Sequence, residues 1–179
     1  MVRNLVGALA LAVMIGIGTQ PVAAQGFAVG YTDIGPTIGI GGIGDASLAF
    51  GGRFEWAWTD LPELGNSVLG IQAGLEYYSW DDNFPLGDAS VSYIPVGVTA
   101  NYHFNLDNDQ IDPFLGLGLG YAIINCDNEG FAYDCSDSEL YFIGRAGLRY
   151  FVNDSWAIYG DIGEGAATLN VGAMYRLRG

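Results

Sequence analysis

Residues 94–104 alternate strictly between apolar side chains and small or polar ones. The apolar positions are Ile94, Val96, Val98, Ala100, Tyr102 and Phe104, and the others are Pro95, Gly97, Thr99, Asn101 and His103. Because successive side chains of a strand point to opposite faces, this pattern predicts a strand with one apolar face. Its length also suits a tilted strand that crosses a bilayer, which takes about 9–11 residues.

The same two-residue period recurs along the rest of the chain. It predicts a first strand within residues 27–43, with a bulge at Gly41-Gly42, and further strands at 47–58, 68–80, 90–104, 113–124, 139–151, 155–163 and 167–177. Short turns such as Gly44-Asp45 and acidic loops at 81–88 and 125–138 separate these strands. No later segment has a helical period. The sequence therefore predicts an all-β fold, an antiparallel up-and-down meander of eight strands.

Residues 1–24 have the three parts of a secretory signal peptide. Arg3 supplies the positive start, residues 5–17 the apolar core, and Val22-Ala23-Ala24 the small-residue cleavage motif before Gln25. The alternative, a retained membrane helix, would need about 20 apolar residues, more than this core offers. We predict export and cleavage, which leave residues 25–179 as one barrel domain.

The polar face of the predicted strands indicates which solvent surrounds the barrel. It consists mostly of Gly, Ala, Thr and Asn, and the chain has no Lys at all. Such a face is too poor in charge for the solvated wall of a soluble barrel such as a lipocalin. It fits the inside of an eight-stranded barrel, whose bore is just wide enough for side chains. We therefore predict a transmembrane β-barrel with its apolar face turned to lipid.

The charged residues favour the same orientation. A lipid-facing Arg near mid-membrane costs about 2–4 kcal/mol, whereas burial inside is tolerable when opposite charges are matched. We predict an interior charge network of Arg53, Glu55, Glu76, Arg145, Arg149, Asp161 and Arg176. The net charge of −14 excludes nucleic acid as a partner, because binding phosphates requires a basic surface.

Aromatic residues gather near the predicted strand ends. Amphipathic rings concentrate at the two water–lipid boundaries of a membrane barrel. If both termini are periplasmic, the predicted aromatic girdle on that side is Trp56, Trp58, Tyr102, Phe104, Tyr150, Trp156 and Tyr175, and on the opposite side Tyr77, Tyr93 and Tyr121.

Three stretches, YIPVGVTANYHF at 93–104, PFLGLGLGY at 113–121 and GRAGLRYFV at 144–152, resemble the outer-membrane protein β-barrel family, which includes OmpX-like proteins and the barrel half of OmpA-like proteins. The resemblance implies a monomer in the outer membrane of a diderm bacterium, in contact with its lipid and inserted by the barrel-assembly machinery. One departure concerns the C-terminus. Family members usually end in an aromatic residue, whereas here Leu177 is followed by Arg178-Gly179.

The longest predicted loop holds the only two cysteines, Cys126 and Cys135. In an exported protein, an isolated pair at this spacing predicts a disulfide, with free thiols as the alternative. Closing so short a loop stabilises the fold by about 2–3 kcal/mol.

Acidic residues crowd this loop and its neighbour, at Asp81, Asp82, Asp88, Asp127, Glu129, Asp134, Asp137 and Glu139. Weak binding of Ca²⁺ or Mg²⁺ is one reading, but no EF-hand spacing is present. We expect a solvated acidic rim without a metal, available to a surface or envelope partner.

Two candidate motifs for cofactor binding or catalysis have simpler explanations. Residues 39–44 match G-x-G-x-x-G, but a strand follows where a dinucleotide site needs a helix. His103 is the only histidine, and no serine nucleophile stands beside it. No cofactor and no catalytic residue are predicted.

The sequence thus favours a non-enzymatic outer-membrane barrel with a structural or surface-interaction role and an interior plugged by charged side chains. The first alternative is a conduit or pocket for a small hydrophobic ligand, as in OmpW-like barrels. The second is an envelope lipid hydrolase that uses His103.

Overall fold

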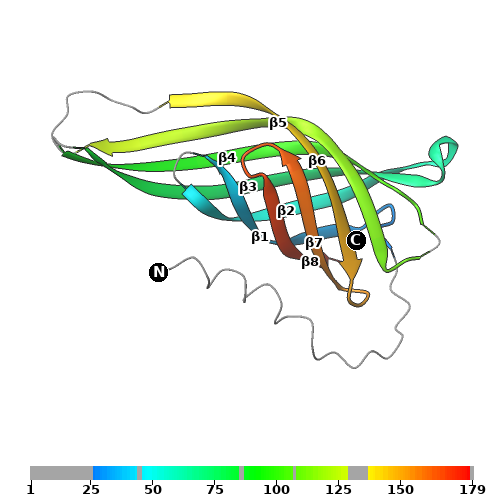
Figure 1. Cartoon of the computed structure of the whole chain (residues 1–179). Coiled ribbons are helices and arrows are strands. Elements are labelled where there is room, and N and C mark those ends of the chain that lie inside the picture. Colours follow the sequence, from blue (N-terminus) through cyan, green and yellow to red (C-terminus); the bar gives the residue numbers. More distant parts are fainter. Residues whose placement is uncertain (1–25, 44–45, 85–86, 107, 129–136, 178–179) are drawn as a thin grey trace.

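The computed structural model describes residues 26–43, 46–84, 87–106, 108–128 and 137–177. The predicted signal peptide, the turn Gly44-Asp45 and the middle of the longest loop lie outside these residues. Eight antiparallel strands form a closed barrel (Figure 1). They are β1 Thr32–Ile43, β2 Ala46–Leu61, β3 Ser67–Phe84, β4 Gly87–His103, β5 Ile111–Asn128, β6 Asp137–Phe151, β7 Trp156–Glu164 and β8 Leu169–Leu177.

Each strand pairs with its neighbours in sequence, and β1 also pairs with β8, which closes the ring. The predicted eight-stranded up-and-down barrel is confirmed. So is the bulge: the register of β1 against β2 shifts between Ile40 and Ile43, and Gly41 has a φ of +72°, which glycine adopts without steric cost. Among the described residues, no helix is long and apolar enough to cross a membrane.

The middle strands are longer than predicted. The ladder between β3 and β4 continues to the pair Phe84 and Gly87, and β5 extends to Asn128. The predicted loop at 81–88 is therefore wrong, because a ladder is held by backbone hydrogen bonds that acidic side chains do not interrupt.

The extra length of β3–β6 forms a separate feature. β7 and β8 have only nine residues each, so β3–β6 project beyond the rest of the barrel wall (Figure 1). We call this projection the protruding sheet; it comprises residues 78–84, 87–93, 121–128 and 137–143.

The barrel wall is apolar outside and polar inside. Phe50, Leu117 and Phe142 are 64%, 63% and 60% exposed, whereas the Arg149 side chain is 2% exposed. The alternation predicted for residues 94–104 holds, with Thr99, Asn101 and His103 buried and Val96 and Val98 exposed. This inversion is the arrangement that lipid requires and water disfavours.

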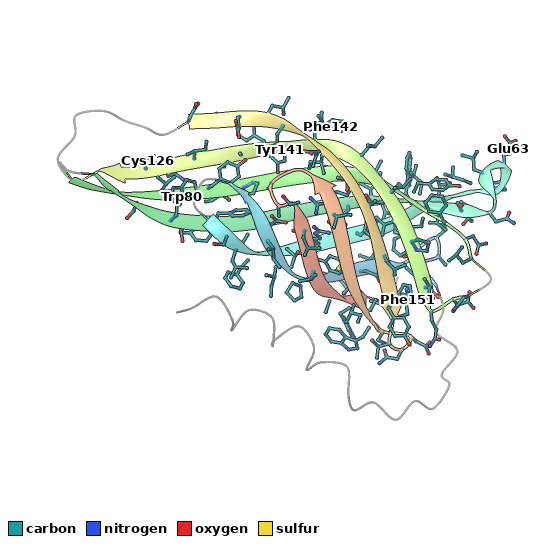
Figure 2. The ribbon with its side chains drawn as sticks, in the orientation of Figure 1. Glu63, Trp80, Cys126, Tyr141, Phe142 and Phe151 are labelled. Carbon is teal, nitrogen blue, oxygen red and sulfur yellow. The ribbon has the colours of Figure 1, made fainter. Side chains whose placement is uncertain are left out.

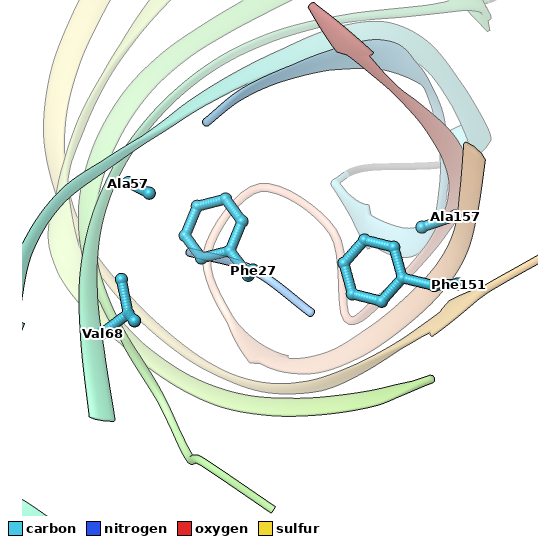
Figure 3. Packing of buried hydrophobic residues seen from close by; sticks show 5 residues of the cluster. All are labelled: Phe27, Ala57, Val68, Phe151 and Ala157. Carbon is cyan, nitrogen blue, oxygen red and sulfur yellow. The ribbon is translucent and has the colours of Figure 1, made fainter. Parts of the chain in front are cut away.

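Two apolar clusters close the interior. At the end where residue 26 and Leu177 lie, here called the terminal end, Phe27 enters the lumen and packs with Ala57, Val68, Phe151 and Ala157 (Figure 3). At the other end, called the loop end, the buried members of the second cluster are Ala49, Tyr78, Tyr93, Ala122 and Ala167. Figure 2 shows Trp80 and Cys126 towards the loop end and Glu63 far from them.

The segment before β1 holds Phe27 in place. Gly30 N–H donates to the Ala57 carbonyl over 3.1 Å, and Ala57 N–H donates to the Tyr31 carbonyl over 2.9 Å. We call residues 26–31 the N-terminal plug. The charged interior of the barrel therefore lies between this plug and the loop-end apolar cluster.

Candidate functional site

Arg149 of β6 is the centre of a buried charge cluster at the terminal end. One of its terminal nitrogens donates to the Glu55 carboxylate and the other donates to Asp33 Oδ2 over 3.3 Å. Its Nε lies 3.8 Å from Asp112 Oδ2. Asp33 also accepts a hydrogen bond from Arg176 Nε, at 3.3 Å. One guanidinium therefore links carboxylates from β1, β2 and β5.

His103 completes this cluster. Its Nδ1 lies 2.9 Å from Asp112 Oδ1, and its Nε2 lies 2.9 Å from Glu55 Oε1. The ring is held between Phe27 and Phe114, with centroid distances of 4.3 and 5.5 Å. Each ring nitrogen therefore lies within hydrogen-bond distance of a carboxylate oxygen. Both hydrogen-bond partners of the ring are carboxylates, and neither is the serine that a hydrolase would require.

A second buried charge cluster lies nearer the loop end. Asp161 of β7 accepts a hydrogen bond from Arg53 at one oxygen and from Arg145 Nε at the other, the latter over 2.6 Å. Asn170 Nδ2 also donates to Asp161, over 3.0 Å. Glu76 stands further off, 3.9 Å from Arg53. The carboxylate of Asp161 thus receives donors from β2, β6 and β8.

All seven residues predicted for the interior network are buried, and they belong to these two clusters. Removing both members of a pair from water costs several kcal/mol per ion, which close pairing and additional hydrogen bonds offset. The described interior contains four Arg and His103 against five acids, Asp33, Glu55, Glu76, Asp112 and Asp161.

Sequence reasoning missed two of these acids. Asp33 falls within residues 27–43, where the alternation is too weak to assign a face, and Asp112 precedes the strand predicted at 113–124. The ladder pairs Asp33 with Arg176 and Asp112 with Arg149, so each acid faces an arginine across a strand boundary. The two-residue alternation of strand side chains predicts that Asp112 faces inward, since it is two residues before the buried Phe114.

Nine of the ten residues of the predicted girdle lie on the outside of the wall. The largest exposures among them are 52% for Trp58, 48% for Tyr121 and 47% for Tyr77. The prediction is wrong for Tyr93, which is 4% exposed, contacts Tyr78 edge-on and donates to Glu139 over 3.3 Å. Tyr93 is one residue from Ile94 and so has the parity of the inner face.

Cys126 lies near the end of β5, opposite Val91 of β4. Cys135 lies outside the described residues, so the disulfide stays a prediction. Within the part of the chain that the structure describes, no three His, Cys, Asp or Glu side chains are arranged to hold a metal ion.

The exposed charges have one sign. All four arginines of the described residues point inward, and the exposed charged side chains there are all acidic. At the loop end these are Asp137, Glu139 and Glu164. The accessible surface therefore offers carboxylates and no cation over the described ranges.

The chain matches one known protein family and is similar in fold to several solved structures. A family described as outer membrane protein beta-barrel domain matches residues 9–176. The fold is similar to that of Ail, the attachment invasion locus protein of Yersinia pestis, with 16% sequence identity, coverage of 83% of this chain and 99% of that chain, and a TM-score of 0.52. For Ail in complex with the heparin analogue sucrose octasulfate, the identity is 15%, the coverage 83% and 99%, and the TM-score 0.54.

A further similar structure is the N-terminal β-barrel domain of Pseudomonas aeruginosa OprF, with 16% identity, coverage of 84% of this chain and 100% of that chain, and a TM-score of 0.49. No curated protein matches the chain.

Proposed function

The chain belongs to the outer membrane protein β-barrel family and resides in the outer membrane, and from this premise we propose that it is a non-enzymatic surface-interaction protein. The barrel anchors it, the two charge clusters plug its bore, and the protruding sheet is the part that meets a partner. The observation that carries this proposal is the open edge of β6. β6 pairs with β7 only from Gly144 onward, so residues 137–143 have no neighbour on that side among the described residues.

An open strand edge is suited to binding. It presents backbone N–H and C=O groups that an extended segment of another chain can pair with, while side chains select the sequence. Leu140 on this edge strand is 71% exposed, which adds apolar area for contact.

Charge indicates the chemistry of the partner. Ail has been crystallised with a heparin analogue, a polyanion. The edge described here carries Asp137 and Glu139 and has no exposed base near it in the described residues. Complementary potentials favour encounter and like charges oppose it. We therefore infer a cationic partner that binds as an extended segment.

Binding of two probes tests this inference. We expect a peptide of alternating Lys and Val to bind the barrel refolded in zwitterionic micelles, more weakly as salt rises, and sucrose octasulfate not to bind. The double variant Asp137→Asn, Glu139→Gln is expected to weaken peptide binding about fivefold, as for two exposed ion pairs. Fluorescence anisotropy with labelled peptide measures both effects.

The matched control is Glu63→Gln, which removes an exposed acid from the turn at the terminal end. Its peptide affinity is expected to equal that of the wild type. Binding of sucrose octasulfate in place of the peptide, or equal loss in the control, contradicts the assigned partner and surface.

The conduit alternative makes a different prediction. It needs an open bore, whereas the plug and the loop-end apolar cluster leave His103 and Asp161 each 2% exposed. We expect the wild-type protein to give no steady nanosiemens-scale channels in planar bilayers. Such channels, seen with protein whose folded state is verified by its heat-dependent gel migration, would favour the conduit instead.

A further inference from the structure

A cavity of about 410 Å³ opens at the terminal end, between the N-terminal plug and the turn that joins β4 to β5. Its volume falls within the range of small-molecule sites, which is about 300–1,000 Å³. The apolar part of its lining includes Phe27 and Val68, which are buried, and Leu106, which is 44% exposed. The cavity therefore offers apolar contact both at depth and at its mouth.

Backbone hydrogen bonds hold both sides of this cavity in place. In the turn, Ile111 N–H donates to the Asn108 carbonyl over 3.1 Å. Phe151 N–H donates to the Gln110 carbonyl over 2.9 Å and so fixes the turn to β6. The opposite side is the N-terminal plug, which is bonded to β2. A ligand would thus enter a site that is already formed, which reduces the cost of ordering on binding.

The charged lining of the cavity is acidic. Asp60, which the ladder places beside Val68, and Asp109 of the turn are both exposed, and neither forms an ion pair within the described ranges. Asp112 and His103 also line the cavity, and they contact each other. Over the described residues no arginine lines it, so two carboxylates at its mouth are left without a protein cation.

We propose that the cavity binds an organic cation, a primary ammonium group carried on an apolar body. Asp60 and Asp109 attract the ammonium, and Phe27, Val68 and Leu106 contact the body. The same carboxylates oppose an anion. A bare metal ion lacks ligands here, because no three His, Cys, Asp or Glu side chains of the described residues are arranged to hold one.

This site is separate from the open edge of β6. It lies at the terminal end, whereas the protruding sheet lies at the loop end. The two sites share no residue, so either can fail its test while the other stands.

Binding of phenylbutylammonium tests the proposal, with neutral phenylbutanol and anionic phenylbutyrate as probes of the same shape. The untagged wild-type barrel is refolded in zwitterionic micelles with isotope-labelled histidine. Because His103 is the only histidine and lines the cavity, its single NMR signal at constant pH reports on probe in the cavity and not on probe in the micelle.

We expect phenylbutylammonium to shift this signal to saturation and to bind about fivefold more tightly than phenylbutanol, as two exposed ion pairs would give. Phenylbutyrate is expected to cause no shift. Absence of a shift with the ammonium, or equal binding of the three probes, overturns the proposal.

Variants separate the two parts of the site. Asp60→Asn, Asp109→Asn is expected to weaken binding of the ammonium about fivefold and to leave that of the alcohol unchanged. Leu106→Ala is expected to weaken both, because it removes apolar contact. The matched control is Glu63→Gln, an exposed acid at the same end that does not line the cavity, and its affinities should equal those of the wild type.

Two results with these variants contradict the assignment. If the double Asn variant binds the ammonium as tightly as the wild type, or loses no more than Glu63→Gln does, Asp60 and Asp109 do not hold the cation. If Leu106→Ala leaves both affinities unchanged, the apolar body does not occupy the cavity.

Discussion

Replacing Arg149 by methionine is expected to destabilise the folded barrel by about 3–5 kcal/mol, the usual result of removing one partner from a buried ion pair. Methionine fills a similar volume but donates no hydrogen bond. It would leave the carboxylates of Glu55, Asp33 and Asp112 without the guanidinium that contacts all three. Urea unfolding in micelles, followed by tryptophan fluorescence, measures the loss.

The control for this prediction is the adjacent residue. Leu148→Met changes a side chain that is 48% exposed on the lipid side and is expected to alter stability by less than about 0.5 kcal/mol. The double variant Arg149→Met, Glu55→Leu should lose about 1–3 kcal/mol less than the sum of its single variants, since contacting residues are coupled. An Arg149→Met protein as stable as the wild type would mean that the cluster does not hold the strands together.

Which face of each strand points into the barrel could be predicted from the two-residue alternation alone. A strand has only two faces, so the placement of Arg53, Arg145, Arg149 and Arg176 on the polar side followed once the register of each strand was set. The strong penalty for charge in lipid leaves a sequence little freedom at these positions.

Strand length was harder to predict. The backbone ladder of β3 and β4 continues through residues 81–88, where composition suggests a loop, because neighbouring strands supply the hydrogen bonds. Apolar periodicity predicts where a strand faces lipid and does not predict where pairing stops. Apolar periodicity therefore could not predict the protruding sheet, which carries the proposed function.

The N-terminal plug also could not be predicted. Residues 26–31 have no alternation, and their position depends on contacts with side chains far along the chain. The guanidinium of Arg149 lies over the ring of Phe27, with its Cζ 4.6 Å from the ring centroid. The guanidinium of Arg176 lies over the ring of Tyr31 in the same way, with a Cζ–centroid distance of 4.1 Å. Such cation–π contacts are stronger when the cation is buried than when it is exposed. The plug and the terminal-end charge cluster therefore depend on each other.

Removing the ring of this plug tests that dependence. Phe27→Ala is expected to cost about 3 kcal/mol of stability, as large-to-small changes of buried aromatics do. It should also expose His103, whose ring packs on Phe27. Both residues line a cavity of about 410 Å³ that opens beside the plug. Because His103 is the only histidine, modification of the untagged protein by diethylpyrocarbonate reports on this one site.

In the wild type the reagent should react slowly, since His103 is 2% exposed, and in Phe27→Ala at least tenfold faster. The control is Phe142→Ala, which truncates an aromatic that is 60% exposed on the outer wall and should leave the rate unchanged. Phe27→Leu keeps most of the apolar volume and is expected to keep His103 protected. If His103 in folded Phe27→Ala reacts as slowly as in the wild type, residues 26–31 do not seal the terminal end, and the protection of His103 must come from the strands.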